Sequence, residues 1–432
     1  MYRQLGIEER IFWSYEQVRP MHFTLTANII GTLPVDRLQQ ALTQVQQRHP
    51  LLNVRIVVDQ FGTPWFTKDS AKIPVRLVKR HSQQQWQQEV EQEIANPFDW
   101  NQAPLIRVVL LQSNDVSDLI ITCDHIIADG MSLVFLLRDI LQVVGLSDRP
   151  LSLLPEQPPY EQLVPQFKPK LQALSFEPSL ATTKTKPTLP ERSRPRLHTW
   201  SLSAAETISL VHRCQQAQTS VHAAICAAFL LAIAHQRTQK NDLQKSTTLK
   251  CLSPISVRRF LPAIEEDFGF YFTVIATTNT ITPDLSLWEL SHSIKAQLNQ
   301  KITPEQIFAH LPYSETFLSR LPTTDEVVDM METVNSYDVL ISNLGRLTIP
   351  QQYGELHLAT VYGPSATTHT DRDMVGVTTL GNQMFFSLIY SELEISPAQI
   401  KQLQQKVMQF LGEGVPKNKL FQKTEESTLV SK

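Results

Sequence analysis

Cysteine is scarce in this chain, with four residues among 432, and no two of them have C-x-x-C spacing. This usage indicates neither a zinc site nor a disulfide framework, so we expect no metal and a reducing, cytoplasmic location. The net charge is only −3. So small an imbalance gives no electrostatic case for a nucleic-acid partner.

Long apolar runs are also missing. The longest, Ala223 to Ala234, is too short to span a bilayer, so we expect no transmembrane segment. The first thirty residues lack a basic segment followed by an apolar run, so no signal peptide is expected either. What remains is the composition of an ordinary globular protein, 42% hydrophobic and 19% charged.

A chain of 432 residues exceeds the size at which one hydrophobic core keeps growing, so two domains are expected. Between about residues 150 and 197 periodic patterns give way to a proline-rich, polar stretch that is typical of a linker. We therefore predict domains at 1–165 and 198–415, a linker at 166–197 and a polar tail at 416–432.

Both predicted domains mix strands with helices. In the first we expect a strand at 23–30, a helix with a buried stripe from Leu38 to Val45 that Pro50 stops, extended structure at 51–58, a helix near 83–96, and a hairpin of 105–111 with 119–123. In the second we expect helices at 203–215 and 221–234, strands at 247–254, 270–277, 338–343 and 356–362, a hairpin across Gly381-Asn382, and a last helix from Ser396. Two halves of similar length predict two α/β sandwiches, each an α+β two-layer unit, with a cleft between them.

The hexapeptide His125-Ile126-Ile127-Ala128-Asp129-Gly130 stands between an apolar strand and a helix with an apolar face. An imidazole at such a junction can take a proton from an alcohol or an amine at neutral pH. Taken alone, a histidine after a strand is more often structural than catalytic. The remaining sequence has to decide between the two interpretations.

The H-x-x-x-D-G pattern resembles the acyltransferase superfamily of chloramphenicol acetyltransferases, nonribosomal peptide condensation domains, BAHD plant acyltransferases and polyketide-associated acyltransferases. Further segments agree, in the expected order from about residue 10 to 410: Arg48-His49-Pro50-Leu51-Leu52, Ser253 to Arg258, Asp267-Phe268-Gly269-Phe270 and Ser342-Asn343-Leu344-Gly345-Arg346. The last two are most similar to the stand-alone, phthiocerol dimycocerosyl transferase-like branch. The resemblance implies two chloramphenicol acetyltransferase-like domains that form a V-shaped pseudo-dimer around a cleft or tunnel.

The resemblance also implies roles for the residues of the hexapeptide. His125 would be the general base in a direct acyl transfer without an acyl-enzyme, which fits the absence of a G-x-S-x-G nucleophile motif. Asp129 would point away from the substrate and pair with an arginine. Arg258 is the first choice for that partner, with Arg259 and Arg346 as alternatives. Gly130 is expected to adopt a backbone conformation closed to residues with a Cβ.

One position departs from the family pattern, because Asp124 stands where condensation domains usually have the first of two histidines. This departure keeps two alternatives open: a catalytically inactive docking module, and an amide-forming condensation enzyme. Asp124, Ser342, Asn343 and His369 are candidates to line the cleft. Ser342 and Asn343 could stabilise an oxyanion, or could simply form a turn.

The family chemistry needs no tightly bound cofactor. The expected co-substrate is acyl-CoA or the phosphopantetheine of an acyl carrier protein, and the expected acceptor is a small alcohol or amine of lipid or polyketide biosynthesis. The sequence does not decide between the two donors. A monomer is expected, because one chain supplies both walls of its own cleft.

Overall fold

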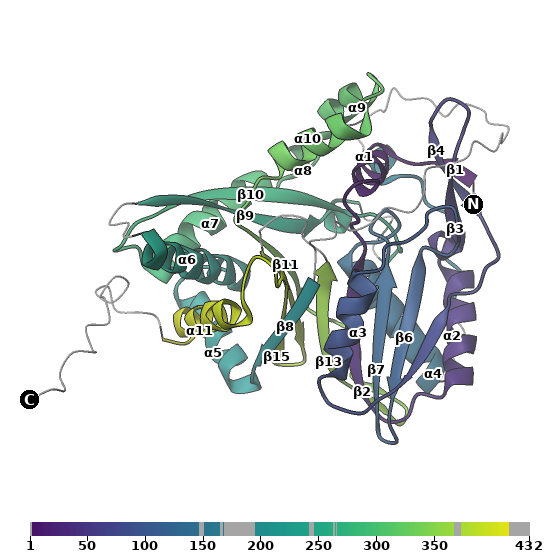
Figure 1. Ribbon diagram of the computed structural model, residues 1–432, viewed down its shortest axis with the longest axis horizontal. Coiled ribbons are helices and arrows are strands. Elements are labelled where there is room, and N and C mark those ends of the chain that lie inside the picture. The colour runs from purple at the N-terminus through teal and green to yellow at the C-terminus, as the bar shows by residue number, and fades with distance from the viewer. Residues whose placement is uncertain are drawn as a thin grey trace, which may run out of the picture.

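The computed structural model describes residues 2–146, 151–164, 167, 195–241, 246–261, 264, 266–366 and 373–413. Two six-stranded sheets form two lobes that lie side by side (Figure 1), so the prediction of a two-lobed α/β fold is confirmed. Most of the predicted linker at 166–197 and the whole tail at 416–432 lie outside the described residues, and the domain boundaries there stay a prediction.

The first lobe contains a sheet in the order β12-β13-β2-β7-β6-β5. Strands β2 and β7 pair antiparallel, as do β6 and β7, which confirms the predicted hairpin. Helix α2 packs against α4, and α3 contacts β2 and β7. The bounds are β2 (Phe23–Ile30), α2 (Val35–Arg48), β5 (Val75–Lys79), α3 (Gln85–Ile94), β6 (Ile106–Gln112), β7 (Val116–Cys123) and α4 (Gly130–Gly145).

Near the amino terminus, a three-stranded sheet and one helix complete this lobe. The sheet has the order β1-β4-β3, and helix α1 lies beside α9 and α10 of the second half (Figure 1). Neither β1 nor α1 was predicted. The bounds are β1 (Tyr2–Gln4), α1 (Ile7–Glu16), the 3-10 helix η1 (Pro50–Asn53), β3 (Val54–Val58) and β4 (Pro64–Lys68).

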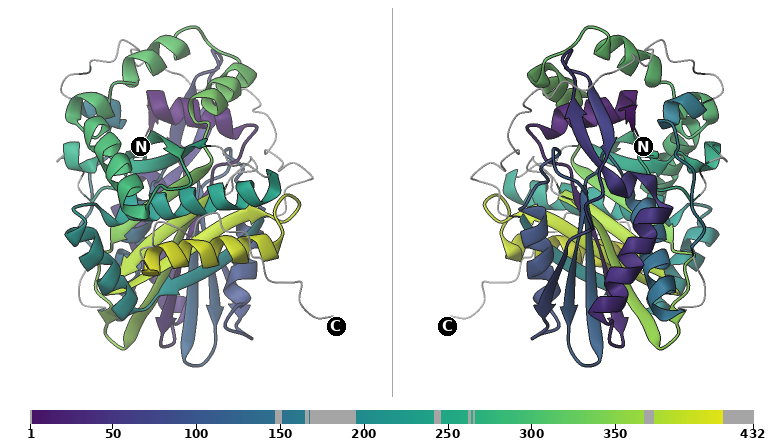
Figure 2. Two further views of the ribbon diagram at one scale, coloured as in Figure 1. Left: turned by 90° about the vertical axis from the view of Figure 1, so that its left-hand side faces the viewer. Right: turned by 90° about the vertical axis from the view of Figure 1, so that its right-hand side faces the viewer.

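The second lobe contains the sheet β10-β9-β11-β14-β15-β8. Helices α6 and α11 cover its outer face in the left view of Figure 2. The predicted strands, helices and hairpin of this half are all present. Their bounds are β8 (Pro195–Leu202), α5 (Ala204–Gln216), α6 (Val221–Asn241), β9 (Thr247–Ser256), β10 (Phe272–Ile281), β11 (Val339–Arg346), β14 (Asp373–Leu380), β15 (Gln383–Ser391) and α11 (Pro397–Glu413).

Further elements were not predicted, and all of them except η2 at residues 160–163 belong to this half. Helix α7 packs on α6 and β10. The bounds are the 3-10 helices η2 (Tyr160–Leu163) and η3 (Arg258–Phe260), and the α-helices α7 (Leu287–Lys301), α8 (Pro304–Ile307), α9 (Leu311–Leu318) and α10 (Thr324–Val334).

One strand from the second half belongs to the first lobe. Strand β13 (Leu356–Ala366) pairs antiparallel with β2, with Val361 opposite Ala27, and the short β12 (Gln352–Tyr353) pairs with β13. The same strand also contacts β14 and β15 of the second sheet. The expectation of two self-contained halves is therefore corrected at residues 352–366, which join the two lobes through backbone hydrogen bonds as well as packing.

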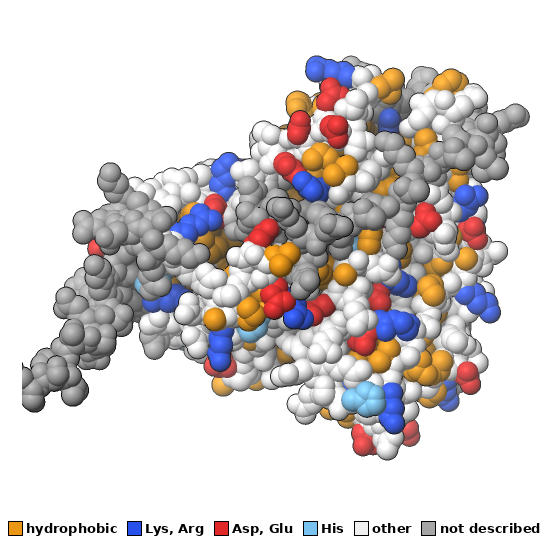
Figure 3. Space-filling model, viewed as in Figure 1, with side chains coloured by type: hydrophobic (Ala, Val, Ile, Leu, Met, Phe, Trp, Pro, Cys, Tyr) orange, Lys and Arg blue, Asp and Glu red, His pale blue; other side chains and the backbone are white. Residues whose placement is uncertain are grey.

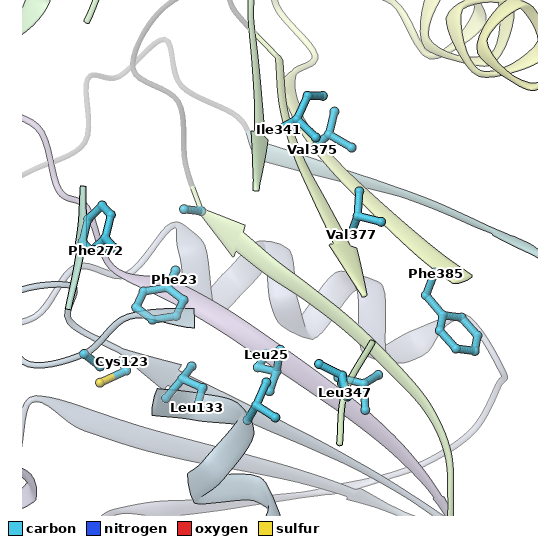
Figure 4. Close-up of a cluster of buried hydrophobic side chains, with 14 of the residues drawn as sticks. Phe23, Leu25, Cys123, Leu133, Phe272, Ile341, Leu347, Val375, Val377 and Phe385 are labelled. Atoms are coloured by element: carbon cyan, nitrogen blue, oxygen red, sulfur yellow. The ribbon is translucent and has the colours of Figure 1, made fainter. Parts of the chain in front are cut away.

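Most buried apolar side chains of the two lobes form one continuous cluster, and two smaller clusters lie beside it. Figure 4 shows part of it, with Phe23 and Leu25 of the first lobe near Phe272, Val375 and Val377 of the second. Within the described residues no single helix is long and apolar enough to cross a membrane. Helices α5 and α6, bent by 99° at their junction, pass that test only as a pair, by length and composition.

Candidate active site

A cavity of about 750 Å³ lies where the two lobes meet, and His125 lines it. Its walls come from α1 (Phe12, Tyr15), from β2 and the start of α4 (Phe23, Gly130, Met131), from β9 and β10 (Leu252, Pro254, Ser256, Phe272, Val274) and from β11 with its flanks (Tyr337, Leu340, Ser342, Asn343, Leu344). Both lobes therefore face the imidazole. A cavity of this size matches those that hold small molecules in other proteins.

The His125 ring is fixed by one hydrogen bond and by aromatic contacts. Its Nδ1 lies 2.8 Å from the carbonyl oxygen of Ala128, so Nδ1 carries the proton and Nε2 is left with a free lone pair. Phe272 stacks on the ring at 4.5 Å between centroids, and Phe23 lies at 4.6 Å. These contacts leave the ring little freedom to turn.

Burial lowers the pKa of His125 below its ordinary value, because a charged imidazolium loses hydration among these rings. Its backbone hydrogen bonds and the negative charge of Asp129 oppose that shift only in part. The imidazole is therefore neutral at pH 7, which is the form that can accept a proton.

Asp129 is held away from the imidazole by two partners. Its Oδ1 accepts hydrogen bonds from the Ser132 backbone N (2.8 Å) and Oγ (2.7 Å), which caps helix α4. Its Oδ2 contacts Arg258 Nη1 in a buried ion pair between the lobes. Arg258 Nη2 also donates to Ser132 Oγ (3.0 Å) and to the Asp267 carbonyl oxygen (2.9 Å). This cluster fixes the loop of His125 and joins the two lobes.

The other candidates near this cluster lie elsewhere. Arg259 lies over the ring of Phe260, and Arg346 donates to the carbonyl oxygen of Gly381, so neither takes the place of Arg258. The expected special conformation of Gly130 is wrong, because its φ does not lie in the left-handed region. A Cβ there would instead lie 2.8 Å from Cδ2 of Leu344, so close packing is what favours glycine.

Asp124 does not line the described cavity. It is 2% exposed, and its Oδ1 accepts a hydrogen bond from the Ile126 backbone N at 3.0 Å. Its carboxyl faces Glu16 of α1 and the indole of Trp100. Burial raises the pKa of Asp124 to about 6, and burial together with Asp124 raises the pKa of Glu16 well above its ordinary range. Asp124, the residue that departs from the family pattern, thus forms a buried acid pair with Glu16 behind the described cavity.

The remaining predicted residues differ in where they lie. Ser342 and Asn343 both line the cavity. Asn343 Oδ1 accepts a hydrogen bond from the Gly345 backbone N at 2.8 Å, and Gly345 has a φ of 71°, so this side chain does form a turn. The expected cleft position of His369 lies outside the described residues.

Several cavity residues were missed from sequence. Phe12 and Tyr15 come from the unpredicted helix α1. Its buried Ile7, Ile11 and Tyr15 recur at a spacing of four residues, a helical signal that could have been found. Phe272 belongs to a predicted strand, but nothing in the sequence shows that its ring stacks on His125.

Two further features bear on chemistry. Cys123 is fully buried, and burial raises the pKa of its thiol well above the usual range, so it is a core residue rather than a nucleophile. Within the described ranges no three His, Cys, Asp or Glu side chains gather as a metal site. On the face shown in Figure 3, acidic and basic side chains are interspersed.

Comparison with known proteins agrees with this geometry. A family model of the condensation domain matches residues 13–429. Chondramide synthase of Chondromyces crocatus is 24% identical over 393 residues, which covers 81% of this chain and 9% of that protein. The chain spans less than a tenth of the length of the curated relatives that it matches.

Two solved structures share the fold. Polyketide synthase associated protein 5 from Mycobacterium tuberculosis has a TM-score of 0.63 at 15% identity, covering 95% of this chain and 98% of that one. The trichothecene 15-O-acetyltransferase of Fusarium sporotrichioides has a TM-score of 0.68 at 14% identity, covering 95% and 94%. At these identities the likeness establishes the fold alone.

Proposed function

This chain belongs to the condensation-domain family, and on that premise we propose that it transfers an acyl group from a thioester to an alcohol or an amine. The observation that carries the proposal is the neutral imidazole of His125 in a cavity walled by both lobes. The donor is acyl-CoA or an acyl carrier protein, and the protein acts as a monomer without a tightly bound cofactor.

In the proposed reaction, Nε2 of His125 takes the proton from the acceptor hydroxyl or amine as its oxygen or nitrogen attacks the thioester carbonyl. The new C–O or C–N bond forms, and the tetrahedral oxyanion then collapses with cleavage of the C–S bond. The departing sulfur takes the proton from the imidazolium. Atoms and charge balance without an acyl-enzyme, and the hydrogen bond of Nδ1 to Ala128 keeps the base in one tautomer.

Asp129 and Arg258 act as positioning residues in this proposal. They fix the loop that carries the base, and neither touches the reacting atoms. Ser342 lines the same cavity and is buried, so its hydroxyl is our candidate donor to the oxyanion. Asn343 is a second candidate, because its Oδ1 accepts a hydrogen bond from the Gly345 backbone N and its Nδ2 is the group that would donate.

The amide-forming alternative uses the same base and differs only in the acceptor. The alternative of an inactive docking module loses part of its motivation. Asp124, the departure that suggested it, is buried behind the described cavity and removes no group from its wall.

The test is an acyl-transfer assay on purified protein, with short and long acyl thioesters of CoA and of a carrier protein, and with alcohol and amine acceptors. We expect His125→Ala to lower kcat/KM by roughly 10²–10⁴ with an unchanged melting temperature. His81→Ala is the matched control, because His81 is exposed and does not line the cavity. Equal turnover of the wild type and His125→Ala would end the general-base assignment, and no turnover with any pair would favour the docking module.

A further inference from the structure

A second cavity, of about 540 Å³, lies on the opposite side of helix α1 from the first. Its walls come from α1 (Arg10, Trp13, Ser14, Gln17), from β3, β4 and their turn (Ile56, Val58, Phe61, Gly62, Pro64), from the loop after α3 (Trp100, Asn101) and from the α9–α10 connection (Leu318, Leu321, Pro322, Thr323, Thr324). Phe61 and Leu321 contribute large apolar side chains that are 71% and 77% exposed. The proposed acyl transfer does not use this cavity.

Arg10 brings a positive charge to the cavity wall, and Asp59 and Glu161 attract this charge without contacting it. Among the described residues no carboxylate lies within 4.0 Å of its guanidinium. The carboxyl of Asp59, one of two acids near enough to influence it, is engaged by the backbone N of Phe61 and Thr63, both at 2.9 Å, and by the Trp65 indole at 3.0 Å.

The second acid, Glu161, offers little charge at neutral pH. Burial is the main cause that raises the pKa of Glu161 to about 8, so this carboxyl is largely protonated at pH 7. Burial also lowers the pKa of the Arg10 guanidinium, since desolvation outweighs the attraction of Asp59 and Glu161. A partly buried cation that no described carboxylate contacts is stabilised further by an anion from solution.

The rest of the wall suits a flat apolar body. Trp13 and Trp100 meet edge to face, with ring centroids 6.3 Å apart, and Phe61 provides a third aromatic ring. The indole Nε1 of Trp13 is buried and has no hydrogen-bond partner among the described residues. Three aromatic side chains and one guanidinium that no described carboxylate contacts thus border the same space.

We propose that this second cavity binds a small organic anion with a planar apolar body, an aromatic carboxylate in its simplest form. The carboxylate would accept hydrogen bonds from the Arg10 guanidinium, which favours planar, bidentate recognition of that group. The ring system would lie against Trp13, Trp100 and Phe61. The volume of about 540 Å³ is within the range of known small-molecule sites.

A ligand there would act on the first cavity through two shared elements. Helix α1 presents Arg10 and Trp13 to the second cavity and Phe12 and Tyr15 to the first. Trp100 lines the second cavity and faces the acid pair of Glu16 and Asp124. Asp124 directly precedes His125 in the chain. Binding should therefore slow hydrogen exchange of the α1 backbone amides.

The experiment is calorimetric titration of the full chain with 2-naphthoate and with its neutral counterpart 2-naphthamide. We expect 2-naphthoate to bind at least tenfold more tightly than the amide, and Arg10→Gln to remove that preference. Arg320→Gln is the charge-matched control, because Arg320 is exposed and does not line the cavity. It should bind 2-naphthoate as the wild type does.

A second variant keeps the test informative if Arg10→Gln does not fold. Ser14→Trp fills the second cavity from α1 and should abolish binding of 2-naphthoate while Arg10 remains. Equal affinity of the wild type for 2-naphthoate and 2-naphthamide would overturn the proposal. Met131→Trp fills the first cavity. Loss of 2-naphthoate binding in Met131→Trp, with full binding by Arg10→Gln and Ser14→Trp, would also overturn it. None of these readouts depends on acyl-transfer activity, so the proposed function and this site can fail separately.

Discussion

The two aspartates that flank the His125 loop, Asp124 and Asp129, have the same side chain but opposite kinds of partner. Asp124 and Asp129 are five positions apart and are 2% and 3% exposed. Asp124 faces a second carboxyl, Glu16, and burial raises its pKa to about 6. Asp129 faces the guanidinium of Arg258 and caps a helix. Two carboxyls at the same depth of burial therefore have different partners, a second acid at Asp124 and a cation at Asp129, and the tertiary structure supplies both.

The comparison also separates two kinds of support for the base. Asp129 joins the lobes through Arg258, which lies 129 positions further along the chain. Asp124 instead joins the loop to α1, whose Phe12 and Tyr15 form a wall of the cavity. The link of Asp129 to Arg258 is an ion pair. The link of Asp124 to Glu16 depends on at least one of the two carboxyls keeping its proton.

The largest effect is expected from breaking the ionic link. Asp129→Ala should lower the free energy of unfolding by about 3–5 kcal/mol, because Arg258 remains buried without its counterion. Urea denaturation measures this loss, and Asp129→Ala combined with Arg258→Met should cost less than the sum of the single changes. Asp69→Ala, at a half-exposed ion pair with Arg55, is the control and should cost about 1 kcal/mol or less. A loss for Asp129→Ala as small as that of the control would contradict the comparison.

Replacing Asp124 should change the free energy of unfolding by less than Asp129→Ala does, and the change should depend on pH. Because the folded-state pKa of Asp124 lies above its ordinary value, its protonated form stabilises the fold at low pH, and this stability is lost as pH rises from about 4 through about 6. Asp124→Asn should flatten that dependence, by the order of 1–3 kcal/mol across the window. Denaturation from pH 4 to pH 8 measures it, with the exposed Asp36→Asn as control. Identical slopes in wild type and Asp124→Asn would refute the raised pKa.

The charge of Asp129 should also be visible in catalysis, as a modest shift. On the acid limb kcat/KM should fall with a midpoint below pH 6.5, because burial lowers the pKa of His125. Asp129→Asn should move the midpoint lower still, since the Asp129 charge raises that pKa. A collapse of kcat by about 10⁴ in folded Asp129→Asn would instead indicate a triad.

The smallest effect is expected at Gly130. An added Cβ would meet the flexible end of Leu344 and would lie at an ordinary contact distance of 3.5 Å from Cγ of Pro364, so Gly130→Ala should change the free energy of unfolding by about 1 kcal/mol or less. Gly145 at the other end of α4 is the matched comparison, because a Cβ there would lie 2.2 Å from the backbone oxygen of Tyr353. Thermal melts of the two variants should differ clearly, and equal losses would mean that contact with backbone is no worse than contact with a side chain.

Much of the fold could be predicted because its patterns are local. Strand β2 was predicted within its observed bounds, and the capping box of Ser203 and Glu206 begins α5 as expected. These signals depend on alternation, helical spacing and caps, which neighbouring residues define by themselves. The crossover of β13 into the first lobe was not predictable in this way, because its apolar run could pair with either sheet.

The candidate site was also predictable only in part. The hexapeptide pointed to His125, and the resemblance pointed to Arg258 as the partner of Asp129. Helix α1, the acid pair of Glu16 and Asp124, and the stacking of Phe272 on His125 were missed. Helix α1 has a helical spacing that could have been found, whereas the acid pair and the ring stacking are contacts between segments far apart in the chain, and such contacts leave no periodic signal.

The amino-acid sequence by itself determined many of the strands and helices of both lobes and the residue offered as the base, because hydrophobic periodicity and a short motif are properties of neighbouring residues. Only the tertiary structure decided which acid pairs with a cation, which rings enclose the imidazole and that α1 separates two cavities. The physical reason is that hydration, pairing and packing depend on distance in space, which the chain sets only when both lobes have come together.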